Sequence, residues 1–431
     1  MNNKKSNFPA DDAPSYESVL QCMRCGFCLP TCPTFALTGR ERSSPRGRVA
    51  LARAVHEGRL DFTEALKDES FFCLDCRACA TACPSGVKAG EVMEICRGQA
   101  RSAFPGGHLS ATLRRFVLER MLPDPARLEG SMLPARLYQR LGIQWLVRHS
   151  HLLKLGPDWL EKAEGMLPKL EMPLRPRLPE LTPARGRKRG RVAFFLGCVM
   201  SLLYPEVSRQ TVRVLAHQGF DVITPRATRC CGAPHLAEGD RQTARRLARH
   251  NLELFLAEEV DAIVTDCAGC GAILKEYDEL LAETVPAGRR ETFRARVRDI
   301  SEFLAEAGLR TDGLGEVRAS VTYHEPCHLC HAQGISKQPR ELLRAIPGVE
   351  LREMNESSWC CGSAATWGLK FTDASRQILK RKLDNVRATG ADYLVTANPG
   401  CQLQLAWGVK QAGLPQQVRH LMELLGRATP E

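Results

Sequence analysis

The sequence predicts a multidomain chain in which a helical, cysteine-rich domain precedes two duplicated α/β domains. Three observations favour this fold class. A run of four cysteines that ends in Cys-Pro occurs twice before residue 85, and strand-like and helical segments with a Cys-Cys-Gly (CCG) motif occur twice after residue 190. Matching landmarks of the two later copies lie at a nearly constant separation. We place the domains at residues 1–100, 101–190, 191–311 and 312–431.

The composition favours a soluble protein with metal or redox chemistry. The 431 residues are 44% hydrophobic and 25% charged, which is ordinary for roughly two to four globular domains. No apolar run suits a membrane span, and the N-terminus lacks the core of a secretory signal. Nineteen cysteines in such a chain indicate bound metal rather than disulfides. The net charge of +11 suits a solvated surface, an anionic membrane or an acidic partner, and we expect no nucleic acid partner.

The two N-terminal cysteine runs have the spacing that holds cubane clusters in bacterial two-cluster ferredoxins. Each is C-x2-C-x2-C-x3-C-P, and the fourth cysteine of each run ligates the other cluster. A structural zinc site would favour paired C-x2-C knuckles, without the third cysteine and the proline. We therefore expect two 4Fe–4S clusters, one held by Cys22, Cys25, Cys28 and Cys83, and the other by Cys73, Cys76, Cys79 and Cys32.

The segment between the two runs predicts a helical ferredoxin domain. Residues 44–58 begin with Ser-Pro, contain helix formers and end at a glycine, which indicates a helix. Cys96 stands alone on another expected helix, where we interpret it as a buried apolar side chain rather than a ligand.

The middle of the chain is expected to be helical and then extended. Residues 101–166 carry apolar side chains at helical spacing among many arginines. We expect amphipathic helices packed on the neighbouring domains, and the alternative is a basic surface that rests on a membrane or a partner subunit. Residues 167–191 are rich in proline and basic residues and are predicted to form an extended linker.

Two later segments of the chain are copies of one another. Residues 192–198 match 321–327, the CCG motif at Cys230 matches that at Cys360, and residues 261–270 match 392–401. Strand-like runs alternate with helical stretches in both copies, which predicts α/β units around parallel strands. The expected strands are 191–197, 220–225, 261–266, 320–325 and 392–397, and the expected helices include 240–259 and 373–390.

The cysteines of both copies follow strands, where loops gather ligands in such folds. The first copy offers five, which exceed the needs of one tetrahedral zinc or one simple cubane and suit a larger or irregular cluster. They are Cys198, Cys230, Cys231, Cys267 and Cys270. The second copy offers Cys327, Cys360, Cys361 and Cys401. There Asn398 replaces the thiol that Cys267 supplies, and Cys330 lies nearby as an extra thiol.

A zinc-protease pattern, H-E-x-x-H, occurs at residues 324–328. That chemistry requires both histidines on one face of a helix. Pro326 and the preceding strand-like residues disfavour such a helix. We expect His324, His328 and His331 to line or gate the second cysteine site instead.

Taken together, these motifs resemble the iron–sulfur subunit of bacterial glycolate oxidase over almost the whole chain. The stretches CGFCLPTCPTF, SPRGRVALA, CCGSAATW and VTANPGCQLQ are similar to that subunit beyond the cysteine spacing. The fold class is therefore a helical two-cluster ferredoxin domain followed by two duplicated α/β CCG domains. Iron–sulfur subunits of lactate utilisation, anaerobic glycerol-3-phosphate dehydrogenase and heterodisulfide reductase are related.

The resemblance implies an electron-transfer subunit of a 2-hydroxy-acid oxidoreductase of the glycolate dehydrogenase type. A flavin-containing partner subunit would oxidise glycolate to glyoxylate, and a membrane quinone would accept the electrons. No dinucleotide fingerprint and no catalytic residue is expected in this chain. In relatives with all five CCG cysteines, these hold a non-cubane 4Fe–4S cluster, which implies a third cluster at the first copy. For the second copy a smaller cluster, another metal or no metal remain open.

Three alternatives remain. The relay could serve lactate or glycerol 3-phosphate, the chain could be a thiol–disulfide reductase, or zinc could stabilise a scaffold without redox chemistry. The missing anchor and the basic linker favour a cytoplasmic protein that associates peripherally with the inner face of the cell membrane.

Overall fold

The computed structural model describes residues 6–10, 12–105, 112, 114–150, 153 and 156–430. The predicted helical stretch 101–166 lies partly outside these residues. Within the described ranges, no helix has the length and apolar character needed to cross a membrane.

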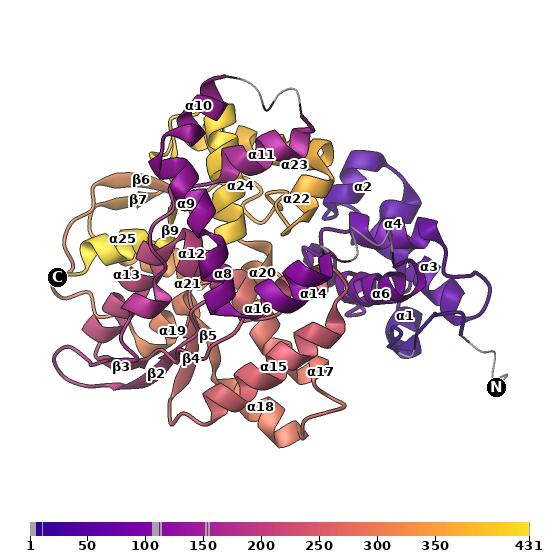
Figure 1. The fold of residues 1–431 in the computed structure, drawn as a ribbon, viewed down its shortest axis with the longest axis horizontal. Coiled ribbons are helices and arrows are strands. Elements are labelled where there is room, and N and C mark those ends of the chain that lie inside the picture. Colours follow the sequence, from indigo (N-terminus) through magenta and orange to yellow (C-terminus); the bar gives the residue numbers. More distant parts are fainter. Residues whose placement is uncertain are drawn as a thin grey trace.

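The N-terminal segment forms a helical lobe, drawn in indigo at the right of Figure 1. The predicted helix 44–58 is confirmed as α3, because Ser44 caps it by accepting a hydrogen bond from the Gly47 N–H at 3.0 Å. Cys96 is fully buried in the core of the lobe, as expected. The helices are α1 (Tyr16–Leu20), α2 (Pro33–Thr38), α3 (Pro45–His56), α4 (Glu64–Phe72), α5 (Ala78–Thr81) and α6 (Ala89–Ala103).

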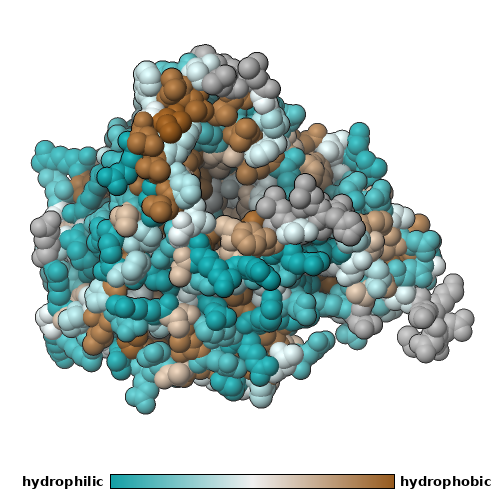
Figure 2. Space-filling view, in the orientation of Figure 1, coloured by the Kyte–Doolittle hydropathy of each residue, from teal (hydrophilic) through white to brown (hydrophobic). Residues whose placement is uncertain are grey.

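The middle segment is helical and only partly packed. It contains a π-helical turn (Phe116–Met121), α8 (Pro125–Ser131), α9 (Leu133–Arg140), α10 (Ile143–His149) and α11 (Asp158–Met166). Helix α11 packs against the C-terminal helices. Helices α9 and α10 and the turn between them, by contrast, leave large apolar side chains exposed: Leu133, Leu137, Leu141, Ile143, Trp145 and Leu146. Figure 2 shows brown, apolar residues on the raised part of the surface where Figure 1 places these helices. The expectation that the apolar residues here pack on neighbouring domains is therefore wrong for α9 and α10.

The predicted extended linker is partly folded. A 3-10 turn (Arg175–Arg177) is flanked by the buried side chains of Leu174 and Leu178. Strand β1 (Leu181–Thr182) then pairs antiparallel with β3 (Phe220–Ile223). The proline-rich segment is thus tied to the first sheet rather than extended throughout.

The first copy is a sheet of order β1-β3-β2-β4-β5. Strands β2 (Gly190–Phe194), β3 (Phe220–Ile223), β4 (Ala262–Thr265) and β5 (Val297–Asp299) are parallel, as predicted for the first three. Its helices are α12 (Cys198–Leu203), α13 (Pro205–His217), α14 (Ala233–Ala237), α15 (Arg241–Leu256), α16 (Ala268–Lys275), α17 (Tyr277–Leu280), α18 (Ala287–Arg296) and α19 (Ile300–Ala307).

The second copy repeats this arrangement in a parallel sheet of order β7-β6-β8-β9. Its strands are β6 (Ala319–Tyr323), β7 (Val349–Leu351), β8 (Tyr393–Thr396) and β9 (Gln417–His420). Its helices are α20 (Cys327–Cys330), α21 (Lys337–Ala345), α22 (Trp367–Lys370), α23 (Thr372–Thr389), α24 (Pro399–Gln411) and α25 (Leu421–Ala428). The order β3-β2-β4-β5 matches β7-β6-β8-β9, so the predicted duplication is visible in the fold.

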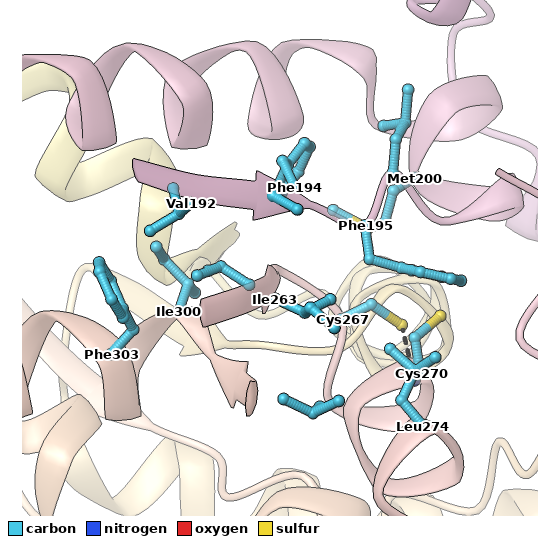
Figure 3. Packing of buried hydrophobic residues seen from close by; sticks show 14 of the residues in the cluster. Val192, Phe194, Phe195, Met200, Ile263, Cys267, Cys270, Leu274, Ile300 and Phe303 are labelled. Carbon is cyan, nitrogen blue, oxygen red and sulfur yellow. Dashed lines mark hydrogen bonds between the residues drawn. The ribbon is translucent and has the colours of Figure 1, made fainter. Parts of the chain in front are cut away.

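One apolar core runs through both copies. Helix α13 packs against α25, and α19 packs against α21, so helices of the two copies interlock. Figure 3 shows Val192, Phe194, Ile263 and Phe303 packed between the strands and helices of the first copy. Cys267 lies at the end of this core, which fixes the position of the thiols that follow the strands.

Candidate iron–sulfur and metal sites

The two N-terminal cysteine loops share an unusual backbone shape. Arg24 (φ 57°) and Gly26 (φ 91°) lie in the first loop, at the positions that Asp75 (φ 52°) and Arg77 (φ 62°) occupy in the second. Non-glycine residues adopt positive φ only at a cost of about 1–3 kcal/mol each. The repeated conformation shows that the two loops fold in the same way, as two copies of one cluster-binding loop would.

The predicted ligand set that combines Cys32 of the first run with three cysteines of the second run is brought together. Cys32, Cys73, Cys76 and Cys79 all line one small cavity of about 20 Å³. Burial and neighbouring thiols raise the pKa of Cys79, and among those neighbours are Cys73 and Cys32. Such clustering of thiols around a cavity fits a metal cluster, whose positive charge would stabilise the thiolates.

The other predicted set is more open. Burial raises the pKa of Cys28, and the nearby Cys22 and Cys32 raise it further. Cys25 is exposed. Cys83 accepts a hydrogen bond from the Val87 N–H at 3.3 Å, and it packs with Cys22 against the core of the lobe.

The five thiols of the first copy line a single large cavity of about 490 Å³. The Cys198 thiol donates to Cys230 Sγ at 3.7 Å, and the neighbouring Cys230 and Cys270 lower the pKa of Cys231. The Cys270 N–H donates to Cys267 Sγ at 3.4 Å, the dashed contact in Figure 3. The predicted five-membered set is thus gathered at one place.

The second copy groups its thiols in the same way. Cys327 and Cys360 lie close enough to shift each other's pKa, and so do Cys360 and Cys361, and Cys361 and Cys401. These four line the same 490 Å³ cavity as the five thiols of the first copy. Asn398 also lines it, and its amide donates to Cys401 Sγ at 3.4 Å. Cys330 is buried near Cys327 but is not part of the cavity lining.

The glycine of each CCG motif has a structural reason. Gly232 (φ 100°) and Gly362 (φ 80°) donate their N–H groups to Cys230 Sγ at 3.5 Å and Cys360 Sγ at 3.4 Å. A Cβ atom at Gly362 would lie 2.9 Å from the carbonyl oxygen of Ser375. Hydrogen bonds to ligand sulfur tune the reduction potential of a cluster, so the motif supplies both a turn and a tuning contact.

The three histidines differ in their placement. His328 lines the cavity, with Nδ1 3.4 Å from Cys327 Sγ, as expected. His331 instead contacts Thr81 of the N-terminal lobe at 3.1 Å, and His324 is fully buried. Strand β6 ends before His324, and α20 begins only after Pro326. The histidines of the H-E-x-x-H pattern therefore do not share a helix, and the protease interpretation fails.

A buried charge network, which the sequence did not predict, joins the lobe to the first copy. Arg77 donates to Glu276 at 2.7 Å and to Asp75 at 2.8 Å. Arg241 of the first copy contacts Glu94 of the lobe at 2.8 Å. Burial beside Asp75 raises the pKa of Glu94 to about 7. No local pattern signals these partners, because Arg77 and Glu276 lie far apart in sequence.

Arg48 is a second residue that sequence reasoning missed. It is buried and donates to Thr34 Oγ1 at 2.9 Å, and Thr34 in turn contacts Cys32 Sγ at 3.2 Å. A signal was present, because Arg48 shares the helical face of Ala52 and Val55. An arginine on an apolar face is usually buried with a partner.

Family models match most of the chain. Residues 18–87 match a 4Fe-4S dicluster domain, residues 110–167 match the linker region of the glycolate oxidase iron-sulfur subunit, and residues 192–275 and 321–406 match a cysteine-rich domain. An N-terminal dicluster domain is thus followed by two CCG repeats.

Three relatives illustrate the similarity. The probable glycolate oxidase iron-sulfur subunit of Bacillus subtilis (strain 168) is 38% identical over 94% of this chain and 93% of its own length. The glycolate oxidase iron-sulfur subunit of Escherichia coli (strain K12) is 31% identical over 96% of this chain and 95% of its own. Lactate utilization protein A of Halalkalibacterium halodurans is 31% identical, over 54% of this chain and 96% of its own length.

Proposed function

This chain belongs to the family of glycolate oxidase iron–sulfur subunits, and from that premise we propose that it is the electron-transfer subunit of a glycolate dehydrogenase complex. A flavin-containing partner subunit oxidises glycolate to glyoxylate, and the electrons pass through this chain toward a membrane quinone. The substrate is oxidised on the partner, so this chain contributes ligands and contacts rather than catalytic residues.

The thiols fit iron–sulfur clusters because none of the nineteen cysteines is in a disulfide and most gather around two cavities. We assign one 4Fe–4S cluster to Cys22, Cys25, Cys28 and Cys83, a second to Cys73, Cys76, Cys79 and Cys32, and a third, non-cubane cluster to Cys198, Cys230, Cys231, Cys267 and Cys270. Bound there, these clusters supply carriers that accept one electron at a time.

The observation that carries the proposal is the shared lining of the large cavity. Cys73 of the N-terminal lobe lines it together with the thiols of both CCG repeats. Cys76 lies close enough to Cys327 and Cys360 for their charges to raise its pKa, after burial, which is the largest cause. The ligand sets are therefore neighbours, as a continuous electron path requires.

Contacts around these thiols join the N-terminal lobe to both repeats. Arg77 and Glu276 lock the lobe against the first repeat. Trp367 of the second repeat donates its indole N–H to the Phe72 carbonyl of the lobe at 3.1 Å. Backbone N–H groups such as that of Gly232 point at sulfur and set the electrostatic environment of the thiolates.

We also propose peripheral contact with the inner face of the cell membrane. The exposed Trp145, Leu141 and Leu146 suit an interfacial position, and the exposed Arg140 is nearby in sequence, at the end of the preceding helix α9. The helical two-cluster ferredoxin at 1–100, the segment 101–190 and the CCG domains at 191–311 and 312–431 remain our division of the chain.

The test uses the complex co-purified with its flavin subunit under anaerobic conditions. Glycolate is expected to bleach the visible cluster absorbance within one turnover, and added quinone is expected to restore it. Faster bleaching by lactate or glycerol 3-phosphate would indicate that this compound, and not glycolate, is the electron donor. Turnover of a small disulfide by the isolated chain would favour the reductase alternative, and clusters that no donor reduces would refute the relay.

A further inference from the structure

His324 is a buried imidazole with a free coordination site. It follows strand β6 directly and has no exposed surface. Neither ring nitrogen has a hydrogen-bond partner of good geometry. Burial lowers the pKa of the ring well below its usual value, and the backbone of Ser357 opposes this shift only in part. An unpartnered polar group in a fully buried position costs about 1–3 kcal/mol, so a partner for this ring is to be expected.

Two thiols face this ring. The ligand atoms of His324, Cys361 and Cys401 all lie within 4.8 Å of one another, and all three residues are buried. Within the described residues, no other trio of His, Cys, Asp or Glu side chains meets that distance. The five thiols of the first repeat all line the large cavity, but none of them belongs to such a trio.

The duplication shows that this imidazole is specific to the second repeat. The offset that aligns Cys198 with Cys327 places Phe195 opposite His324. Phe195 is a fully buried core residue that packs on Phe255, with ring centroids 5.6 Å apart. The second repeat has therefore lost one thiol, at Asn398, and gained one imidazole nitrogen.

We propose that the second repeat binds a single Zn²⁺ ion through His324, Cys361 and Cys401, in place of a second cluster of the kind assigned to the first repeat. Mixed nitrogen and sulfur ligands in a compact tetrahedral arrangement select zinc. Zinc–sulfur bonds of about 2.3 Å and zinc–nitrogen bonds of about 2.0–2.1 Å bring the ligand atoms closer than 4.8 Å, so the three side chains contract slightly around the ion.

The surroundings complete the site. The Asn398 amide, which donates to Cys401 Sγ at 3.4 Å, orients one thiolate in the way that outer hydrogen bonds orient metal ligands. Cys361 and Cys401 line the large cavity and His324 does not, so the fourth coordination position faces the cavity, where Cys360 or a water molecule completes the set.

The test measures metal content and zinc coordination in the full chain, purified without oxygen. We expect about one zinc per chain, and X-ray absorption at the zinc edge with sulfur neighbours at about 2.3 Å and nitrogen at about 2.0–2.1 Å. His324→Phe, which restores the residue type of the first repeat, is expected to lose the zinc and leave the iron content unchanged. His331→Asn, directly after helix α20, is the matched control and is expected to keep both metals.

A second variant distinguishes the loss of a zinc ligand from a general folding defect. His324→Cys is expected to keep about one zinc per chain while the nitrogen neighbour is replaced by sulfur. Wild-type chain without zinc, zinc that survives in His324→Phe, or about four further irons that depend on His324 would each overturn the proposal. The proposal does not rest on the electron-transfer role, which the iron at the N-terminal loops reports separately.

Discussion

Cys267 and Asn398, which occupy the same position in the two repeats, touch one another: the Cys267 thiol lies 3.8 Å from Asn398 Oδ1. The Gly269 N–H donates to the same oxygen at 3.1 Å, and the Ala268 N–H donates to the Ala397 carbonyl at 3.0 Å. The repeats therefore meet edge to edge at the loops that follow β4 and β8. This contact explains why both thiol sets line one cavity.

Cys267→Asn gives the first repeat the residue that the second repeat has at this position. We expect the iron content to fall by about four atoms per chain, because the five-thiol set is then incomplete. Iron and acid-labile sulfide analysis of anaerobically purified protein measures the loss. Cys96→Ala is the control, since Cys96 is buried away from the cavities and should leave the iron content unchanged. Equal iron content in Cys267→Asn and wild type would mean that the five thiols of the first repeat hold no iron–sulfur cluster.

Gly362→Ala is expected to destabilise the second repeat by about 1–3 kcal/mol or more, because alanine must adopt positive φ and its Cβ approaches the Ser375 carbonyl. Gly39→Ala also has positive φ but meets open space, so it should cost only about 1 kcal/mol. Urea unfolding of both variants gives the comparison. Equal losses of unfolding free energy would mean that the close approach to the Ser375 carbonyl does not destabilise the Gly362→Ala variant.

Arg77→Met leaves Asp75, Glu94 and Glu276 without their shared cation. Removing one partner of a buried ion pair costs about 3–5 kcal/mol, and we expect a loss of that size in unfolding free energy. Arg249→Met breaks an exposed pair with Glu253 and should cost less than about 1 kcal/mol. If the two variants unfold at the same denaturant concentration, the network does not lock the lobe to the repeat.

Asp299 makes the stability of the folded protein depend on pH. Burial raises its pKa to about 6, so the folded state holds a proton that the unfolded state releases at lower pH. Its contribution to stability is complete below the unfolded pKa and is lost as pH rises through about 6. Asp299→Asn cannot titrate and still caps α19, so its stability relative to wild type should rise by about 1 kcal/mol from pH 5 to pH 7. A difference that stays flat over this range would contradict the protonated carboxyl.

The local patterns of the sequence were sufficient for the duplicated strands and the cysteine spacing. Strands β2, β4, β6 and β8 are apolar and buried, so their composition identifies them. Strands β5, β7 and β9 were missed because segments such as Val297–Asp299 and Gln417–His420 are short and polar. These short strands form because each pairs with a neighbouring, more apolar strand: β5 with β4, β7 with β6 and β9 with β8.

The candidate site was predicted as lists of thiols but not as a shared cavity. Spacing along the chain identifies the cysteines, and it says nothing of Cys267 facing Asn398 or of Arg77 reaching Glu276. His324 was expected at the second site, yet its burial behind Cys361 and Cys401 depends on how β6 and β8 pair. Such contacts arise from tertiary packing, which leaves no periodic signal in the sequence.

The central claim is that three iron–sulfur clusters occupy the thiol sets of the N-terminal lobe and the first repeat. Iron and acid-labile sulfide per chain, measured on the full chain purified without oxygen, test it most directly. We expect about twelve irons and about as many sulfides. About eight irons would leave the first repeat without a cluster, and zinc in place of iron would contradict the relay itself.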